Sequence, residues 1–142
     1  MSVVYYKKNP YGAVIISDGI MLQGEVISSA IKLQKLKGEV ILGMVGDFRI
    51  NQYIAQELNT DDAHEVSNWS LKDAYKRLSE IIKEFHQIQS LKEHDQGDST
   101  ALLIVAKQTV FTVFLSEDCE RISVYDESNS DEVSIGYDEH LL

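Results

Sequence analysis

A small hydroxyl residue, Ser2, directly follows the initiator Met1. If Met1 is removed, the Ser2 hydroxyl can attack a carbonyl carbon while the freed α-amine of the same residue serves as the general base. The reference pKa of an α-amine is roughly 7.7–8.0, which is close to a working pH. A nearby ammonium group, such as that of Lys32, would lower the pKa of both the amine and the hydroxyl. This set of groups predicts hydrolysis of a peptide or another amide.

Two further residues would complete such a site. Asp18 would hold the Lys32 ammonium in place through its charge, and a backbone N–H near Gly43 would bind the oxyanion that forms after attack. Gly43 and Gly46 stand where an apolar run gives way to a helical pattern. There a glycine can present its N–H to a ligand or simply relieve crowding between strand and helix. The residue types leave both interpretations open, because a serine after Met1 is commonplace.

Composition excludes several other classes of protein. The chain has 142 residues, which suits a single domain spanning residues 1–142, and 44% of them are hydrophobic, which is enough for a core. Thirteen basic residues against 23 acidic ones give a net charge of −10. Without a basic stripe the chain cannot neutralise phosphates, so neither a nucleic acid nor an anionic membrane is expected as a partner.

The single cysteine, Cys119, rules out an intrachain disulfide and fits a reducing compartment. Its acidic neighbours Glu117, Asp118 and Glu120 would raise the pKa of the thiol, so we expect no nucleophilic role for it. The sequence contains neither a secretory apolar region nor an apolar run of about 18 residues. We therefore expect a cytoplasmic protein.

The usual cofactor and metal signatures are also absent. The sequence has no GxGxxG, Walker, HExxH, GxSxG or CxxC motif, so neither a cofactor nor a metal ion is expected. His94 with Asp95 and Asp98 could hold a metal ion, but a solvated helix end is the simpler interpretation.

Hydrophobic patterning predicts strands toward both ends of the chain. The predicted strands are Val3–Tyr6, Ala13–Ile16, Ile20–Leu22, Glu25–Ile27, Ile31–Leu36 and Val40–Gly46, then Ala101–Ala106, Val110–Leu115, Ile122–Tyr125 and Val133–Gly136. Pro10 and Gly12 predict a hairpin between the first two. The continuous apolar run Ala13–Ile16 predicts a strand buried on both faces.

Two predicted helices separate these groups of strands. Asp47 is placed to cap a helix that ends near Leu58. Ser70 and Asp73 form a variant of the capping box, which opens a longer helix reaching about Leu91. Apolar residues on one side of each helix predict that both lie on a sheet. This order predicts an α+β fold of stacked antiparallel sheets with two helices on one face.

The order of these segments resembles the proteasome β-subunit and HslV-type peptidases of the N-terminal-nucleophile (Ntn) hydrolases. Ser2 stands where that family has its catalytic threonine, and Asp18-Gly19 follows sixteen residues later, as in the family. Lys32-Leu33 resembles the family's lysine and its hydrophobic neighbour, and Gly43 stands for the glycine whose N–H binds the oxyanion. The resemblance covers nearly the whole chain and implies an Ntn-type fold with these four residues in its catalytic roles.

The chain departs from the family pattern in three places. Serine replaces threonine at position 2, and Tyr137-Asp138-Glu139 stands where the family has a supporting Ser-Gly-Gly. The sequence ends at Leu142, before the helices of the family's second helical layer. We therefore expect a truncated, divergent member in which that layer is missing or incomplete.

Two functions remain open on these grounds. The first is a non-catalytic or degenerate protein that acts as an assembly or binding module. The alternative is an Ntn peptidase or amidase that uses Ser2 on a peptide substrate after Met1 is removed. A sheet without its second helical layer would expose apolar surface, so we also expect a copy of the chain to cover it in a homo-oligomer.

Overall fold

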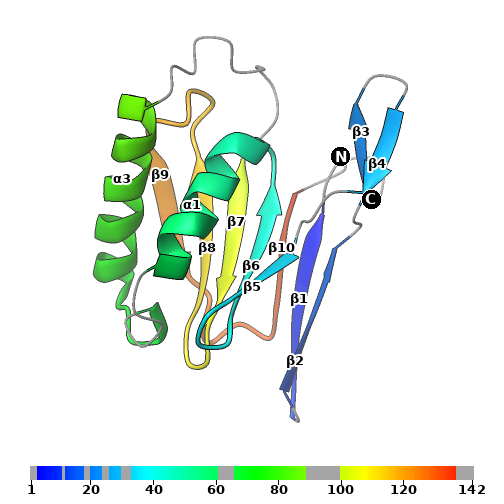
Figure 1. The fold of residues 1–142 in the computed structure, drawn as a ribbon. Helices are drawn as coiled ribbons and strands as arrows, with labels where there is room; N and C mark the ends of the chain where they lie inside the picture. The colour runs from blue at the N-terminus through cyan, green and yellow to red at the C-terminus, as the bar shows by residue number, and fades with distance from the viewer. Residues whose placement is uncertain are drawn as a thin grey trace.

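The computed structural model describes residues 3–10, 12–17, 20–23, 26–29, 33–60, 66–88 and 100–136 (Figure 1). Five strands form an antiparallel sheet in the order β5-β6-β7-β8-β9. They are β5 (Leu33–Leu36), β6 (Val40–Val45), β7 (Ala101–Val105), β8 (Val110–Leu115) and β9 (Ile122–Asp126).

A second antiparallel sheet has three strands in the order β10-β1-β2. They are β1 (Val4–Asn9), β2 (Gly12–Ser17) and β10 (Glu132–Ile135). β1 and β2 form the predicted hairpin. A separate two-stranded hairpin joins β3 (Ile20–Gln23) to β4 (Val26–Ser29).

Two helices lie side by side on one face of the five-stranded sheet: α1 (Phe48–Thr60) and α3 (Leu71–Ile88) (Figure 1). Asp47 caps α1 as predicted, because its Oδ1 accepts the N–H groups of Arg49 at 2.8 Å and Ile50 at 3.3 Å. The predicted capping box opens α3, where the Asp73 N–H donates to Ser70 Oγ and the Ser70 N–H donates to Asp73 Oδ2, both at 3.1 Å.

The main core fills the space between the helices and the five-stranded sheet. Its fully buried side chains include Leu42, Ile50, Ile54, Leu78, Ile81, Leu102, Ile104 and Phe111. The helical residues among them recur every three or four positions, which directs them to one face of each helix.

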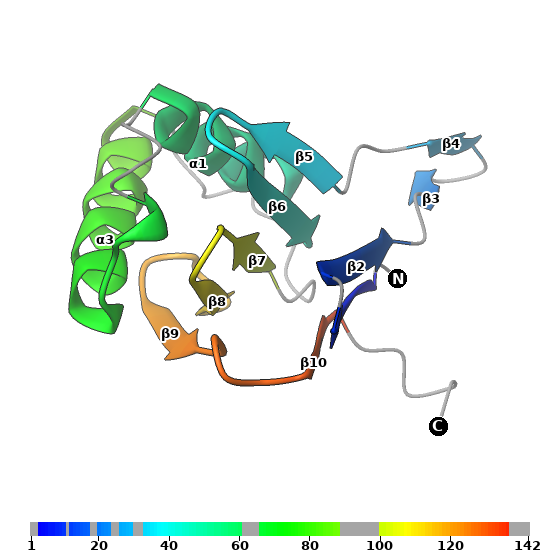
Figure 2. The same cartoon turned by 90° about the horizontal axis from the view of Figure 1, so that it is seen from below.

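A smaller core joins the two sheets on the other side, where the three-stranded sheet lies (Figure 2). It contains Val4, Tyr6, Val45, Ala101, Leu103, Val110, Val133 and Ile135. Alternation along β1 explains why Val4 and Tyr6 belong to this core, since both point inward while Tyr5 and Lys7 point outward.

These layers confirm the predicted fold class: an α+β protein with stacked antiparallel sheets and two helices on one face. Neither helix of the described ranges combines the length and the apolar character that a membrane-spanning segment needs.

The prediction for Ala13–Ile16 is wrong in one respect. The run does form a strand, β2, but this strand lies at the edge of its sheet and is not buried on both faces. Its side chains Val14 and Ile16 remain 47% and 55% exposed. A continuous apolar run reports only the strand's own residues, whereas burial depends on which other elements cover it.

Candidate functional site

Three of the four residues predicted to act in hydrolysis, Ser2, Asp18 and Lys32, lie outside the described residues. The fourth, Gly43, lies in the interior of β6, between β5 and β7. Gly43 and the nearest described neighbours of the other three are the part of the predicted site that the structure describes.

The neighbours of the candidate nucleophile and the candidate lysine meet at Gly43. Leu33, directly after the lysine in sequence, is the β5 partner of Gly43. Val4, two residues after the nucleophile, packs onto Gly43 from the other sheet, where a Cβ added to the glycine would lie only 2.5 Å from Val4 Cγ1. A single contact between the two sheets thus joins the starts of β1 and β5.

The neighbour of the candidate aspartate joins the same place. Ser17, which directly precedes Asp18 in sequence, is the β2 partner of Val4. The described segments next to all three candidates therefore converge on the contact between Val4 and Gly43, which we call the Val4–Gly43 junction.

Gly43 itself has a packing role at this junction. It is buried, and no side chain of ordinary size fits between it and Val4. Gly43 therefore relieves crowding, but between the two sheets and not between a strand and a helix as the sequence suggested. Its predicted role at the oxyanion stays a prediction.

Gly46 has the geometry of a better N–H donor than Gly43. It is exposed directly after β6 and has a φ of 90°, a conformation that residues with side chains rarely adopt. β1 starts at the end of the molecule where β6, the strand directly before Gly46, finishes (Figure 1).

Asn51, which the sequence analysis did not single out, fixes the peptide unit before Gly46. Its Nδ2 donates to the carbonyl oxygen of Val45 at 2.9 Å, and its side chain is almost fully buried under α1. The carbonyl of Val45 and the N–H of Gly46 belong to one planar trans peptide, so they point in opposite directions. The Gly46 N–H is therefore held pointing away from Asn51. The sequence signal was an amide inside the apolar stripe of a helix, next to Ile50.

The electrostatics at the start of α1 are set by Asp47. Partial burial favours a higher pKa for its carboxyl group, but the Arg49 guanidinium and the backbone N–H groups of Ile50 and Arg49 outweigh this and lower the pKa. The Asp47 N–H in turn donates to Thr100 Oγ1 at 3.0 Å, which ties the start of α1 to the start of β7.

Cys119 is buried beside this region, and its pKa is raised. Burial is the main cause, and the carboxylates of Asp47 and Asp118 add to it, while a hydrogen bond with Thr100 opposes it. A raised thiol pKa is also the reason for which the sequence predicted a poor nucleophile. His86 contacts the same turn, with its Nε2 2.6 Å from the carbonyl oxygen of Cys119.

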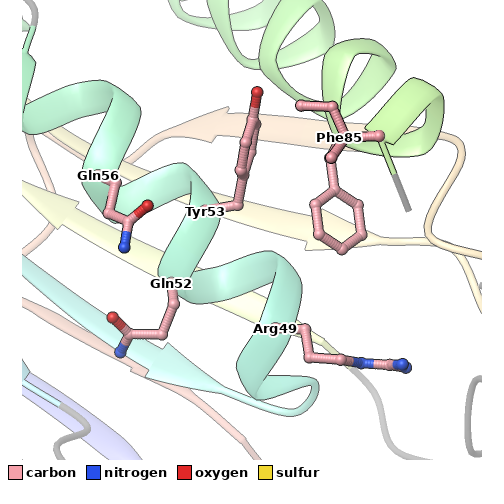
Figure 3. A pocket seen from close by; sticks show the side chains of 6 residues that line it. Arg49, Gln52, Tyr53, Gln56 and Phe85 are labelled. Atoms are coloured by element: carbon pink, nitrogen blue, oxygen red, sulfur yellow. The ribbon is translucent and has the colours of Figure 1, made fainter.

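A shallow hollow of about 160 Å³ lies on the outer side of the helices (Figure 3). It is lined by Arg49, Gln52, Tyr53, Gln56, Phe85 and Ile88. The Tyr53 and Phe85 rings pack at 5.4 Å between centroids, and Arg49 Nη2 lies 3.1 Å from Asp47 Oδ2. The hollow offers a packed aromatic pair and a cation that is paired with Asp47, and among the residues that line it the one hydroxyl is that of Tyr53.

No group of three or more His, Cys, Asp or Glu side chains is arranged to hold a metal ion in the part of the chain that the structure describes. The weak metal candidate at His94, Asp95 and Asp98 lies outside that part.

Comparison with known proteins gives matches only among solved structures. No protein-family model matches the chain, and no curated protein does. Anbu (ancestral beta-subunit) from Yersinia bercovieri superposes with a TM-score of 0.58 at 16% identity, covering 96% of this chain and 60% of that one. The Anbu (Gly-1) mutant from Hyphomicrobium sp. strain MC1 gives 0.56 at 14% identity, with 98% and 61% covered. BPH from Thiobacillus denitrificans gives 0.56 at 16% identity, with 96% and 72% covered.

These likenesses show the fold, which is proteasome-like and of the kind seen in Anbu. The chain spans about three fifths of the length of the two Anbu chains. They also correct the assignment to the HslV-type and proteasome β-subunit peptidases, which is wrong at that level. The structural neighbours are Anbu proteins at 14–16% identity, and the HslV-like family is only loosely related to them.

Proposed function

We propose that this chain hydrolyses a peptide or another amide with Ser2 as an N-terminal nucleophile, after removal of Met1. The observation that carries the proposal is the Val4–Gly43 junction, where the described neighbours of Ser2, Asp18 and Lys32 converge. A proteasome-like fold supports this choice of chemistry, because Val4, near the start of β1, is packed in the core between the two sheets.

Covalent geometry limits how far the three candidates can lie from that junction. Consecutive Cα atoms are about 3.8 Å apart, so Lys32 and Asp18 each lie within that distance of a described junction residue, Leu33 or Ser17. Ser2 is two residues from Val4, which allows at most about 7 Å. The proposal requires the hydroxyl, the ammonium and the carboxylate to meet at this junction.

The chemistry follows from these groups. Ser2 Oγ attacks the carbonyl carbon of the substrate amide, while the α-amine of Ser2 takes the proton from the hydroxyl. The oxyanion that forms accepts a hydrogen bond from a backbone N–H. The tetrahedral intermediate collapses to an ester on Ser2, and the leaving amine takes the proton from the α-ammonium. Water then attacks the ester with the same amine as base, which releases the acid and restores the hydroxyl.

For the oxyanion we favour the N–H of Gly46. Gly43 is buried beneath Val4, whereas Gly46 is exposed and its N–H is held in one direction by the bond from Asn51 to Val45. Lys32 would lower the pKa of the amine, and Asp18 would orient Lys32.

The test begins with the intact mass of protein purified from the cytoplasm of its native host, where the lone buried thiol leads us to expect it. Loss of Met1 is the expected result, and its retention would end the mechanism, because an acylated nitrogen cannot act as the base. The matured protein is then assayed on a panel of peptides and simple amides. Ser2→Ala should reduce turnover to background and Ser2→Thr should keep it, with Ser134→Ala on β10 as the control.

A second candidate function is a non-catalytic assembly or binding module, and a different observation favours it. Apolar side chains of the three-stranded sheet remain exposed on the side away from the helices, at Val14 and Ile16. Such surface is typical of a contact with another chain. A protein that self-associates, yet shows the same turnover as Ser2→Ala across the whole panel, would favour this function over hydrolysis.

A further inference from the structure

β2 is an apolar edge strand without the usual protection. Its residues, Gly12–Ser17, include no charge and no proline. The sheet order ends at β2, and no described strand pairs with its outer edge. Its register with β1 is regular along all six pairs, so no bulge twists the edge away. Unpaired N–H and C=O groups along such a strand are a template for another strand.

The other edges of the two larger sheets are different. β5 carries Gln34 and Lys35, β9 carries Ser123 and Asp126, and β10 carries Glu132 and Ser134. Polar and charged side chains on an edge strand disfavour pairing with another chain. β2 alone among these four edges has an uninterrupted apolar run, with Val14 47% and Ile16 55% exposed.

The strand is complementary to a second copy of itself. In an antiparallel pair related by a twofold axis through Ile15, that residue lies opposite its own copy, and Val14 lies opposite Ile16 of the other chain. Both side chains of the second pair are on the outward face, so four branched apolar residues would gather there. No charge faces a charge along the paired strands, because β2 has none.

The charges near β2 also favour a second copy of this chain as the partner. Residues 3–17 contain Lys7 and Lys8 and no acidic residue, so with a net charge of −10 for the whole chain the remainder carries −10 − 2 = −12. Antiparallel pairing sends the two hairpin tips in opposite directions, which keeps the lysines of one copy away from those of the other. The lysine-bearing tip and the remainder of the chain have charges of opposite sign, which favours association of one copy with another.

We propose that two copies of this chain associate through antiparallel β2 strands, forming a continuous six-stranded sheet in the order β10-β1-β2-β2-β1-β10. The pairing gives the second candidate function its interface and does not depend on hydrolysis. One strand pair is small beside standard interfaces, which bury about 1,200–2,000 Å² in total, so the dimer should be weak and dependent on concentration.

The first test is sedimentation velocity over a concentration series, with two matched lysine variants. Ile16→Lys places a charge opposite Val14 of the partner and should weaken the dimer by roughly tenfold or more. Ser134→Lys places the same charge on the same outward face but on the opposite edge strand, and should leave the dimer unchanged. A monomer at every concentration overturns the proposal, as does equal loss in both variants, which would indicate docking on the face of the sheet. Binding of an extended apolar peptide at the edge by a monomeric protein also overturns it.

The second test fixes the register and does not depend on how well Ile16→Lys folds. Ile15→Cys places two thiols opposite each other across the twofold axis, within reach of a disulfide. Oxidation should give a covalent dimer, while Ser134→Cys under the same conditions should remain monomeric on a denaturing gel. The buried native thiol of Cys119 is common to both proteins and serves as an internal control. Equal cross-linking in the two variants would contradict the β2 pairing.

Discussion

The two sheets of this molecule use the same alternation of inward and outward side chains, but their outer faces are covered differently. α1 and α3 cover one face of the five-stranded sheet and the three-stranded sheet packs on the other, so strands such as β8 bury five of their six residues. No described helix lies over the three-stranded sheet, and all residues of β2 are exposed or only partly buried. β2 and β8 both contain a run of apolar residues, so the difference in their burial lies in what packs against each strand.

This comparison separates two kinds of apolar residue. A side chain in the helix-covered core stabilises the fold of one chain, whereas an exposed apolar residue of β2 adds little to that fold. If it has a role, the role lies in contact with something else.

The largest expected effect tests this difference directly. Leu78→Ala removes a fully buried side chain between α3 and the five-stranded sheet, and should lower the free energy of unfolding by about 2–5 kcal/mol. Ile16→Ala should change it by less than about 0.5 kcal/mol, because the side chain is already 55% exposed. Urea unfolding at a protein concentration where the chain is monomeric measures both. Comparable losses of unfolding free energy in the two variants would show that the outward face of the three-stranded sheet is buried in the free chain.

The next largest effect on stability is expected at the Val4–Gly43 junction, where the two sheets meet. Gly43→Ala puts a methyl group 2.5 Å from Val4 Cγ1, which should cost about 1–3 kcal/mol of unfolding free energy through overpacking. Val4→Ala removes the clashing atom, so the double variant should be less destabilised than the sum of the two single variants. Additive losses in this double-mutant cycle, measured by chemical unfolding, would mean that the sheets do not touch at this point.

Much of the fold was predictable from the sequence, because it follows from local patterns. The caps at Asp47 and Ser70, the spacing of apolar residues in both helices and the order of strands determine the α+β layers. The exposure of β2 was not predictable, since it depends on which elements lie beside the strand in space. The close approach of Val4 to Gly43 depends likewise on the distance between two sheets, which no local pattern reports.

The candidate site was predictable in part. Ser2, Asp18 and Lys32 were chosen by residue type and spacing, and their described neighbours do converge, although the three residues themselves stay a prediction. The exposure of Gly46 and the support from Asn51 required coordinates, because they depend on how the chain leaves β6 and on the direction of one peptide unit.

A smaller effect on stability is expected from two buried polar side chains, Asn51 and Thr112, which lie on opposite faces of the five-stranded sheet. Asn51→Leu removes the donor to the Val45 carbonyl on the helix side and leaves a buried acceptor without a partner, but it also removes Asn51 Oδ1, which has no partner among the described residues. The net cost should be about 1 kcal/mol. Thr112→Val keeps the shape of a residue on the other face whose hydroxyl has no partner among the described residues, and should be neutral or slightly stabilising. Thermal unfolding followed by circular dichroism compares them. A destabilised Thr112→Val would reveal a partner for that hydroxyl and remove the contrast.

The smallest effects concern pH, where the two regions should respond at opposite ends of the scale. On the helix side, the pKa of Asp47 lies below its ordinary value of 3.8, so the ionised group contributes stability above that value and loses it as the pH falls through the lower, folded pKa. Asp47→Asn cannot titrate but can still cap α1, so its unfolding free energy should fall less steeply in acid than that of the native chain.

On the three-stranded sheet the pH dependence of stability has the opposite sign. The Tyr5 hydroxyl donates to the Glu132 carboxylate across β1 and β10, and this hydrogen bond is the main reason that the pKa of Tyr5 lies above its ordinary value of 10.0. The bond therefore contributes stability below pH 10.0, which is lost as the pH rises through the folded pKa. Tyr5→Phe should flatten the alkaline limb of the stability profile and leave the acid limb unchanged, whereas Asp47→Asn should do the opposite. Urea unfolding over a pH series tests both variants, and a change on the same limb in each would show that the two regions do not titrate independently.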